Sequence, residues 1–142
     1  MSGLSAEVVD FIASGRVGRL ATADGSGQPL VVPICYAWDG EALLSAVDAK
    51  PKRAGQLRRV HNIRENPKVS VVIDQYEEDW RRLRWVIIQG VAEILTAGGD
   101  FAKAVDLLVA KYPQYVGLGL SREQGTMIKD RPGKVLQWRY AS

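Results

Sequence analysis

The chain has 142 residues, of which 46% are hydrophobic and 25% charged, and its formal net charge is +3. This size and balance are typical of a globular protein and exclude a disordered chain, so residues 1–142 are expected to form one domain. The basic residues are mixed with 16 acidic ones, which argues against the continuous Lys/Arg stripe of a nucleic-acid-binding surface.

The first third of the chain predicts one helix and three strands. Ser5 is a favourable N-cap for a helix at 5–14. Apolar, β-compatible runs then predict strands, which cover 17–23, 28–38 and 41–47. Asp39-Gly40 is a strong hairpin signal between the last two strands. Pro29 and Pro33 have no amide to donate, so the middle strand is expected at an edge or at a bulge.

The remaining two thirds alternate strands with helices. Pro51 suits the first turn of a helix, and Asn66-Pro67 ends that helix. The expected elements in chain order are a helix at 51–65, a strand at 69–73, a polar hairpin tip at 75–83, a strand at 85–95, a helix at 100–111, an irregular segment at 112–129 and a strand at 134–140. Most strands are consecutive and hairpin-linked. This order indicates a mainly β protein, a six-stranded antiparallel β-barrel with flanking helices.

Two of the expected strands are apolar on both faces. In the strand at 28–38 one face carries Leu30, Val32, Ile34 and Tyr36, and the other carries Val31, Pro33, Cys35 and Ala37. The strand at 85–95 behaves similarly. A sheet with one face in water alternates apolar with polar residues, so these strands need a cover on each side. The barrel core is one cover, and we expect a homodimer to supply the other.

The single cysteine, Cys35, excludes a disulfide within the chain and favours a reducing compartment. No secretory signal is visible, and no apolar run approaches the ~20 residues of a membrane span. We therefore expect a cytoplasmic protein with neither a membrane nor a nucleic acid as partner. His61 is the only histidine and has no Cys or His cluster around it, so no metal site is predicted. Cys35 is expected to be a buried strand residue rather than a nucleophile.

A basic corner, Asp48-Ala49-Lys50-Pro51-Lys52-Arg53, joins the strand at 41–47 to the helix at 51–65. A helix N-terminus has unpaired amides and a partial positive charge, and it therefore attracts phosphate. Arg can hold two phosphate oxygens, whereas Lys acts as a point charge. Cations at this end oppose the helix dipole, a cost that a bound anion would offset. The pattern predicts a phosphate site, and a solvated basic turn is the alternative.

Four segments carry a resemblance to a known family. They are 18–22 (GRLAT), 29–33 (PLVVP), the basic corner and 57–70 (LRRVHNIRENPKVS). In this order they resemble the pyridoxamine-phosphate-oxidase-like (FMN-binding split-barrel) superfamily, and more closely its probable coenzyme F420 (deazaflavin)-dependent oxidoreductases. The resemblance covers nearly the whole chain, from about Val9 to Tyr140.

The resemblance implies a homodimeric split β-barrel that holds two cofactors in clefts between its subunits. It makes Lys50, Lys52 and Arg53 phosphate ligands. It also implies that the tail and ring of the cofactor are lined by Ser45, Ala46, Val47 and Asp48, and that the second strand passes the ring at Val32 and Pro33. Ile73 and Gln89 are secondary candidates. Trp138 and Arg139, on the last strand, are expected to reach the site of the partner subunit.

The implied activity is hydride transfer from reduced F420 to a small organic acceptor. The cofactor supplies the redox step, so no catalytic triad is required, and none is visible. The acceptor also needs a proton, for which water, Tyr36 and Tyr115 are candidates. The segment 112–129 contains Gly117, Gly119 and Gly125 and either closes over the ring or is an ordinary packed loop. Two alternatives stay open: an FMN-dependent oxidoreductase on the same barrel, and a non-catalytic cofactor or haem carrier.

Overall fold

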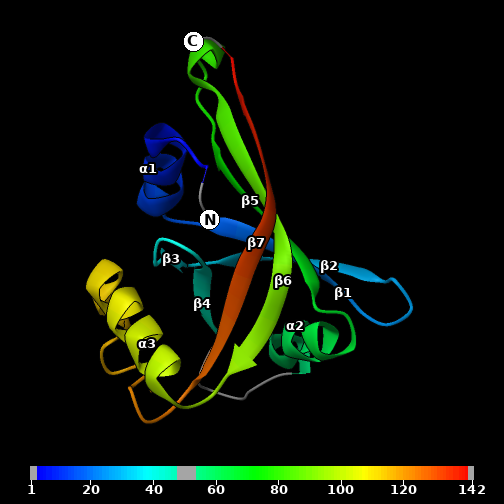
Figure 1. Cartoon of the computed structure of the whole chain (residues 1–142), viewed down its shortest axis with the longest axis vertical. Coiled ribbons are helices and arrows are strands. Elements are labelled where there is room, and N and C mark those ends of the chain that lie inside the picture. The colour runs from blue at the N-terminus through cyan, green and yellow to red at the C-terminus, as the bar shows by residue number, and fades with distance from the viewer. Residues whose placement is uncertain (1–2, 48–53, 141–142) are drawn as a thin grey trace.

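The computed structural model describes residues 3–47 and 54–140, which form one curled antiparallel sheet with helices packed against it (Figure 1). The strands are β1 Gly18–Ala23, β2 Pro29–Ile34, β3 Ala37–Trp38, β4 Leu43–Val47, β5 Lys68–Gln75, β6 Arg84–Leu95 and β7 Thr126–Arg139. The α-helices are α1 Ala6–Ser14, α2 Ala54–Glu65 and α3 Gly99–Lys111, and the short 3-10 helices are η1 Trp80–Arg82 and η2 Pro113–Tyr115. The order across the sheet is β2-β1-β5-β6-β7-β4-β3. The expected mainly β barrel with flanking helices is confirmed.

The expected strand at 28–38 is interrupted, so the sheet has seven strands rather than six. β2 pairs with β1 at one edge of the sheet, and β3 pairs with β4 at the other. The chain therefore crosses from edge to edge at Cys35 and Tyr36. The N–H of Tyr36 donates to the Tyr112 hydroxyl (3.2 Å) instead of to a neighbouring strand. This crossing curls the sheet into a barrel.

The helix α1 begins where the sequence predicts. The Ser5 hydroxyl accepts a hydrogen bond from the N–H of Val8 at 3.2 Å, as an N-cap does. Gly15, which follows the helix, is needed for space rather than for a left-handed backbone. A Cβ at Gly15 would lie 2.3 Å from the Tyr36 hydroxyl oxygen and 2.9 Å from Ile73 Cγ2.

The last strand begins earlier than expected. β7 starts at Thr126 rather than at residue 134, so part of the segment predicted to be irregular belongs to the sheet. It pairs with β4 through its first residues and with β6 along its whole length. The register shifts between Gln89 and Gly90, opposite Pro132 and Gly133. This bulge accommodates two residues that ordinarily weaken a strand.

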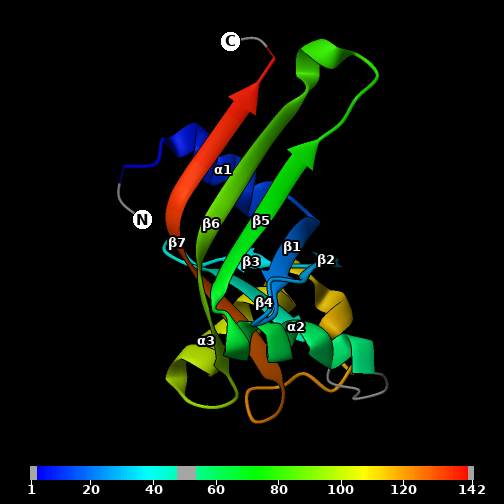
Figure 2. The ribbon, with the colours of Figure 1, turned by 90° about the vertical axis from the view of Figure 1, so that its right-hand side faces the viewer.

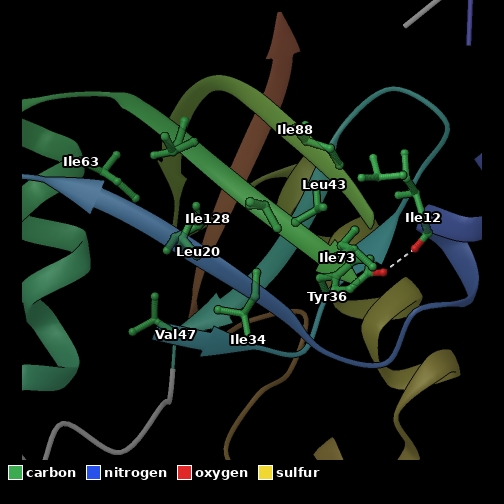
Figure 3. Close-up of a cluster of buried hydrophobic side chains, with 14 of the residues drawn as sticks. Ile12, Leu20, Ile34, Tyr36, Leu43, Val47, Ile63, Ile73, Ile88 and Ile128 are labelled. Carbon is green, nitrogen blue, oxygen red and sulfur yellow. Dashed lines mark hydrogen bonds between the residues drawn. The ribbon is translucent and has the colours of Figure 1, made fainter. Parts of the chain in front are cut away.

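The larger hydrophobic core lies inside the barrel, and α1 and α2 contribute side chains to it (Figure 3). Tyr36 points from the strand crossing toward α1, where its hydroxyl donates to the Ile12 carbonyl at 2.5 Å. A second core lies between α3 and the sheet and includes Phe101, Leu108 and Met127. α3 packs on β3 and β4, which also supply the barrel wall. The two cores therefore share those strands.

The strands β5, β6 and β7 extend past the barrel as a twisted arm (Figures 1 and 2). α1 lies against this arm, where the Arg84 guanidinium packs over the Phe11 ring at 4.3 Å. Several aromatic side chains on the arm are exposed: Tyr76, Trp80, Trp138 and Tyr140. In the part of the chain that the structure describes, no helix has the length and apolar character needed to cross a membrane.

Candidate functional site

A cleft of about 280 Å³ opens where the ends of β2 and β4 meet α2 and the segment after η2. Its apolar wall is formed by Pro33, Ile34, Ala46, Val47, Leu118 and Leu120. Three lining side chains carry other chemistry: Cys35, Arg59 and Tyr115. Among the described lining residues, Arg59 is the only one with a permanent charge, since Arg stays protonated in proteins. The cleft is therefore an apolar slot with one cation in its wall.

The cleft lies between two elements that the basic corner connects. Val47 is the last residue of β4, and Ala54 is the first of α2. Arg59, one turn further along α2, lines the cleft. Asp48, Lys50, Lys52 and Arg53 lie outside the described residues.

The cleft brings together some of the cofactor-binding residues predicted from the sequence. Pro33, Ala46 and Val47 line it. Ser45 is only 2% exposed and pairs with Ile128 inside the sheet. Val32 is half-buried and packs against the barrel core. Ser45 and Val32 are therefore not among the residues that line the cleft.

Trp138 and Arg139 lie far from this cleft within one chain. Val47 pairs with Thr126, the first residue of β7. Arg139 ends this 14-residue strand, which spans about 45 Å at ~3.3 Å per residue. There Trp138 stacks on Trp85 with ring centroids 6.5 Å apart, and Arg139 pairs with Glu7. A chain does not bring these two residues to its own cleft.

The two tyrosines predicted as proton donors differ in their access to the cleft. Tyr36 is fully buried, its hydroxyl is already donating inside the core, and burial raises its pKa well above the ordinary value. Tyr115 lines the cleft. Its ring meets that of Tyr112 edge-on, with centroids 6.1 Å apart. Of the two, only Tyr115 can face a bound molecule.

The outer wall of the cleft is built on glycines. Gly117 and Gly119 have φ values of +86° and +88°, a region that favours glycine. Val116 precedes these two glycines and Leu118 lies between them. Their apolar side chains are 70% and 48% exposed. Leu120, in contrast, is buried in the second core. This segment therefore exposes apolar side chains, and its backbone conformation at Gly117 and Gly119 is one that residues other than glycine rarely adopt.

Sequence reasoning missed Arg59 and misplaced Cys35. The expectation that Cys35 is buried is wrong: its side chain is exposed, because it sits at the crossing between β2 and β3 and not within a continuous strand. Arg59 flanks the buried Val60 on α2. The helical pattern indicates that it lies beside the apolar face, but not that residues 115–120 lie opposite it.

The secondary candidates do not join the cleft. Ile73 is buried in the barrel core. Gln89 lines a second, wider groove of about 610 Å³ on the outer face of β1, β5 and β6, together with Thr22, Val69 and Val91. Val31 and Val91 on the sheet are 61% and 53% exposed. In residues 3–47 and 54–140 there is no group of three or more His, Cys, Asp or Glu side chains placed to hold a metal ion.

A family model described as pyridoxamine 5'-phosphate oxidase matches residues 4–139 of the chain. The chain belongs to the pyridoxamine 5'-phosphate oxidase family. The match spans the barrel, the arm and all three α-helices, so the cleft is part of the pyridoxamine 5'-phosphate oxidase domain.

A curated enzyme is similar in sequence to about two thirds of the chain. A 5a,11a-dehydrotetracycline/5a,11a-dehydrooxytetracycline reductase from Streptomyces rimosus is 29% identical over 92 residues, which cover 64% of this pyridoxamine 5'-phosphate oxidase family chain and 63% of that protein. The match thus spans less than two thirds of that relative.

Three solved structures resemble the pyridoxamine 5'-phosphate oxidase fold seen here. An FAD-binding protein from Mesorhizobium loti is 26% identical, with a TM-score of 0.70 and coverage of 94% of this chain and 92% of that one. An F420 reductase is 22% identical, with a TM-score of 0.65 and coverage of 89% and 94%. The haem storage protein HutZ from Vibrio cholerae is 16% identical, with a TM-score of 0.72 and coverage of 94% and 93%. The last two likenesses show the fold alone.

Proposed function

We propose that this chain is an F420-dependent oxidoreductase that transfers a hydride from the reduced deazaflavin to a small organic acceptor. The observation that carries the proposal is the apolar cleft at the junction of β4 and α2, beside the basic corner. The reductase from Streptomyces rimosus and the F420 reductase structure support the same class of chemistry.

The residues present suit a ring with a phosphate-bearing tail. A flat ring needs apolar walls, which Pro33, Ala46 and Val47 provide. A phosphate needs cations and free amides, which the sequence places at Lys50, Lys52 and Arg53. When bound, the cofactor supplies the hydride chemistry.

The protein's own part in the reaction is to bind, to shield and to manage a proton. Leu118 and Leu120 keep water away from one side of the cleft. In this proposal the side chain of Tyr115, which lines the cleft, donates the proton to an acceptor seated there. We assign the proton to Tyr115 rather than Tyr36, because the Tyr36 hydroxyl is fixed in the core.

The active form that we propose is a homodimer. The groove on the outer face of β1, β5 and β6 is mainly apolar, and Val31 and Val91 are exposed on the sheet. A second subunit on this face would cover them. Such a dimer would let Trp138 and Arg139 of each arm serve the site of the other subunit. Light scattering at micromolar protein concentration tests this assembly. A molar mass equal to that of a monomer would contradict it.

A side-by-side titration of the protein with F420, FMN and haem tests the proposed cofactor. We expect F420 to bind tightest and its reduced form to be consumed by candidate acceptors. A protein that is yellow with copurified FMN would instead favour an FMN enzyme. Saturable binding with no turnover against any acceptor would favour a cofactor or haem carrier.

The phosphate site is tested by Lys52→Ala. Loss of one charge-assisted contact should weaken F420 binding by ~1–3 kcal/mol, roughly 5- to 150-fold. Lys103→Ala, on the exposed face of α3, is the matched control. Equal F420 affinity of the Lys52 and Lys103 variants in a fluorescence titration would refute the assignment of Lys52.

A further inference from the structure

The end of the arm carries two arginines directly opposite each other. Arg84 on β6 pairs with Arg139 on β7 in the antiparallel register, and like charges in facing positions repel each other. Beyond Asp130, β7 pairs with β6 and no longer with β4. Within the described sheet, the end of β7 is therefore held against this repulsion by β6 alone.

A single carboxylate from α1 compensates both arginines. Glu7 Oε1 accepts a hydrogen bond from the Arg139 guanidinium and lies 3.7 Å from Nη2 of Arg84. The same Nη2 donates to the backbone carbonyl of Glu7 at 3.2 Å. One anion thus offsets the repulsion between two cations that the pairing of β6 with β7 forces together.

α1 is itself fixed to the barrel and therefore gives Glu7 a firm base. Val8 and Ile12, on its inner face, are 3% and 0% exposed in the larger core. Toward the arm, an open cleft of about 590 Å³ is lined by Glu7, Phe11 and Arg84 among others. The Arg84 guanidinium also packs over the Phe11 ring. Side chains that reach across this cleft therefore link α1 to the end of the arm.

The stacked tryptophans of the arm occupy the adjacent strand positions. Trp85 follows Arg84 and Trp138 precedes Arg139, and successive residues of a strand point to opposite faces. The charged cluster and the two stacked rings therefore lie back to back on the same strands. A change in the separation of β6 and β7 at the arginines would also change the stack.

We propose that Glu7 is a positioning residue, which fixes the end of the arm so that Trp138 faces the cleft of the partner subunit. This inference rests on the proposed function, because it assumes the homodimer in which each arm serves the other subunit's site. The side chain of Glu7 is 55% exposed, and exposed ion pairs contribute little to global stability. Loss of Glu7 should therefore change the geometry of the arm and leave the stability of the barrel nearly as it was.

The first measurement is circular dichroism of the Trp pair, which needs no cofactor. Stacked indole rings couple electronically, and the paired band that results depends on the distance and angle between Trp85 and Trp138. At low ionic strength Glu7→Gln should reduce this band by about half or more, because the two arginines are left uncompensated. Asp10→Asn, an exposed change on α1 at the same cleft, is the matched control and should leave the band unchanged.

A second substitution distinguishes repulsion from a general loss of order. Glu7→Gln combined with Arg139→Gln leaves one cation at the end of the arm, so it should restore most of the paired Trp band. Glu7→Asp keeps the charge on a shorter side chain and should retain most of the band. Unfolding midpoints establish that each variant is folded.

F420 binding in mixed dimers shows which subunit Glu7 serves. Glu7→Gln should weaken F420 about three- to tenfold in a fluorescence titration. Leu118→Glu puts a charge in the apolar wall of its own cleft and should also weaken F420. In a dimer of one subunit of each kind, the intact cleft faces the intact arm, so one of the two sites should bind F420 as in the unmodified protein. If neither site does, Glu7 serves its own subunit and the inference is refuted.

The outcomes separate this inference from the proposed function. If the unmodified protein is a monomer or binds no F420, both fall. If it is a dimer that binds F420, and Glu7→Gln changes neither the paired Trp band nor the F420 affinity, the role of Glu7 is refuted and the proposed function stands. A changed Trp band with unchanged F420 affinity also refutes it, because the end of the arm would then not serve the cleft. Weaker F420 binding with an unchanged Trp band refutes it as well, because Glu7 would then act by another route.

Discussion

Arg59 and Asp130 each place an ionisable group among apolar side chains, and they differ in what lies beside them. Arg59 borders a cleft that a ligand can enter. Asp130 is 1% exposed on β7, where its cross-strand neighbours are Leu43 on β4 and Ala92 on β6, both buried. Neither carboxyl oxygen of Asp130 has a hydrogen-bond partner among the described residues.

The two sites therefore differ in what can reach the charged group. A molecule that enters the cleft can contact Arg59, which makes the residue a candidate for recognition. Asp130 lines neither this cleft nor the groove on β1, β5 and β6, and a proton can neutralise its carboxylate. Burial raises the pKa of Asp130 to about 7. A charged residue in an apolar setting therefore indicates binding only where a cavity adjoins it.

The largest expected effect is on the pH dependence of stability, through Asp130→Asn. The folded-state pKa of about 7 exceeds the ordinary value of 3.8. Between these values the unfolded chain has released the proton and the folded chain keeps it, so the free energy of unfolding falls as pH rises. The loss across this window is at most about 4 kcal/mol. Asp130→Asn should remove it, so that the variant is more stable than the unmodified protein at pH 8.

Urea unfolding at several pH values from 4 to 8 measures this difference. Asp10→Asn, an exposed change on α1, is the control and should leave the pH dependence as it was. If Asp130→Asn and the unmodified protein give parallel curves, Asp130 does not hold a proton in the folded state, and the contrast with Arg59 fails.

Gly90→Ala tests whether the space around Asp130 is truly closed. A Cβ at Gly90 would lie 2.3 Å from the Arg131 carbonyl oxygen and 2.3 Å from Asp130 Oδ1. Since the carbonyl is backbone, relief requires a shift of β7, and we expect a loss of ~2–3 kcal/mol in unfolding free energy. Gly133→Ala is the matched control, because its Cβ would lie 3.7 Å from the Gln89 carbonyl oxygen, an ordinary contact. Equal stabilities of the two variants would mean that β6 and β7 can move apart at Gly90 without a loss of stability.

Local patterns in the sequence predicted the elements well, and the failures came from long-range packing. Ser5 caps α1 as expected, because capping depends only on the residues of one turn. The strand at 28–38 was predicted as continuous, since nothing local shows that Tyr36 bonds to Ile12 and Tyr112 instead of to a neighbouring strand. The start of β7 was missed because Pro132 and Gly133 weaken the strand signal, and a bulge opposite Gly90 accommodates them.

The candidate site was also predictable only in part, because some of its residues are brought together by long-range packing. Pro33, Ala46 and Val47 could be chosen because the family resemblance fixes their places on strands, and they line the cleft. Arg59 could not, because its importance depends on Leu118 and Leu120 lying across from it, far along the chain. Asp130 could not either: it stands between Lys129 and Arg131, and the sequence gives no sign that it alone of the three points into the barrel.

Lys111 on α3 is a third charged group in a largely apolar setting, intermediate between the other two. Its Nζ is buried and has no hydrogen-bond partner within residues 3–47 and 54–140, but it lies 4.0 Å from the centroid of the Tyr36 ring. Burial and, secondarily, the nearby Arg16 lower the pKa of Lys111 to about 8. The face of the Tyr36 ring therefore compensates only part of the cost of burying the Lys111 ammonium.

The smallest expected effect is that of Lys111→Met. The folded-state pKa of about 8 lies below the ordinary 10.5, so between these values the unfolded chain keeps its proton while the folded chain has released it. The free energy of unfolding should therefore rise with pH across that window, and Lys111→Met should abolish the rise. At pH 7 the variant escapes the cost of the buried ammonium and loses the contact with the Tyr36 ring. Because Lys111 is partly exposed, solvent reduces both contributions, and we expect a net change below about 1 kcal/mol. A loss of more than about 2 kcal/mol in urea unfolding at pH 7 would show that the aromatic contact outweighs the burial, so that Lys111 is satisfied where it lies.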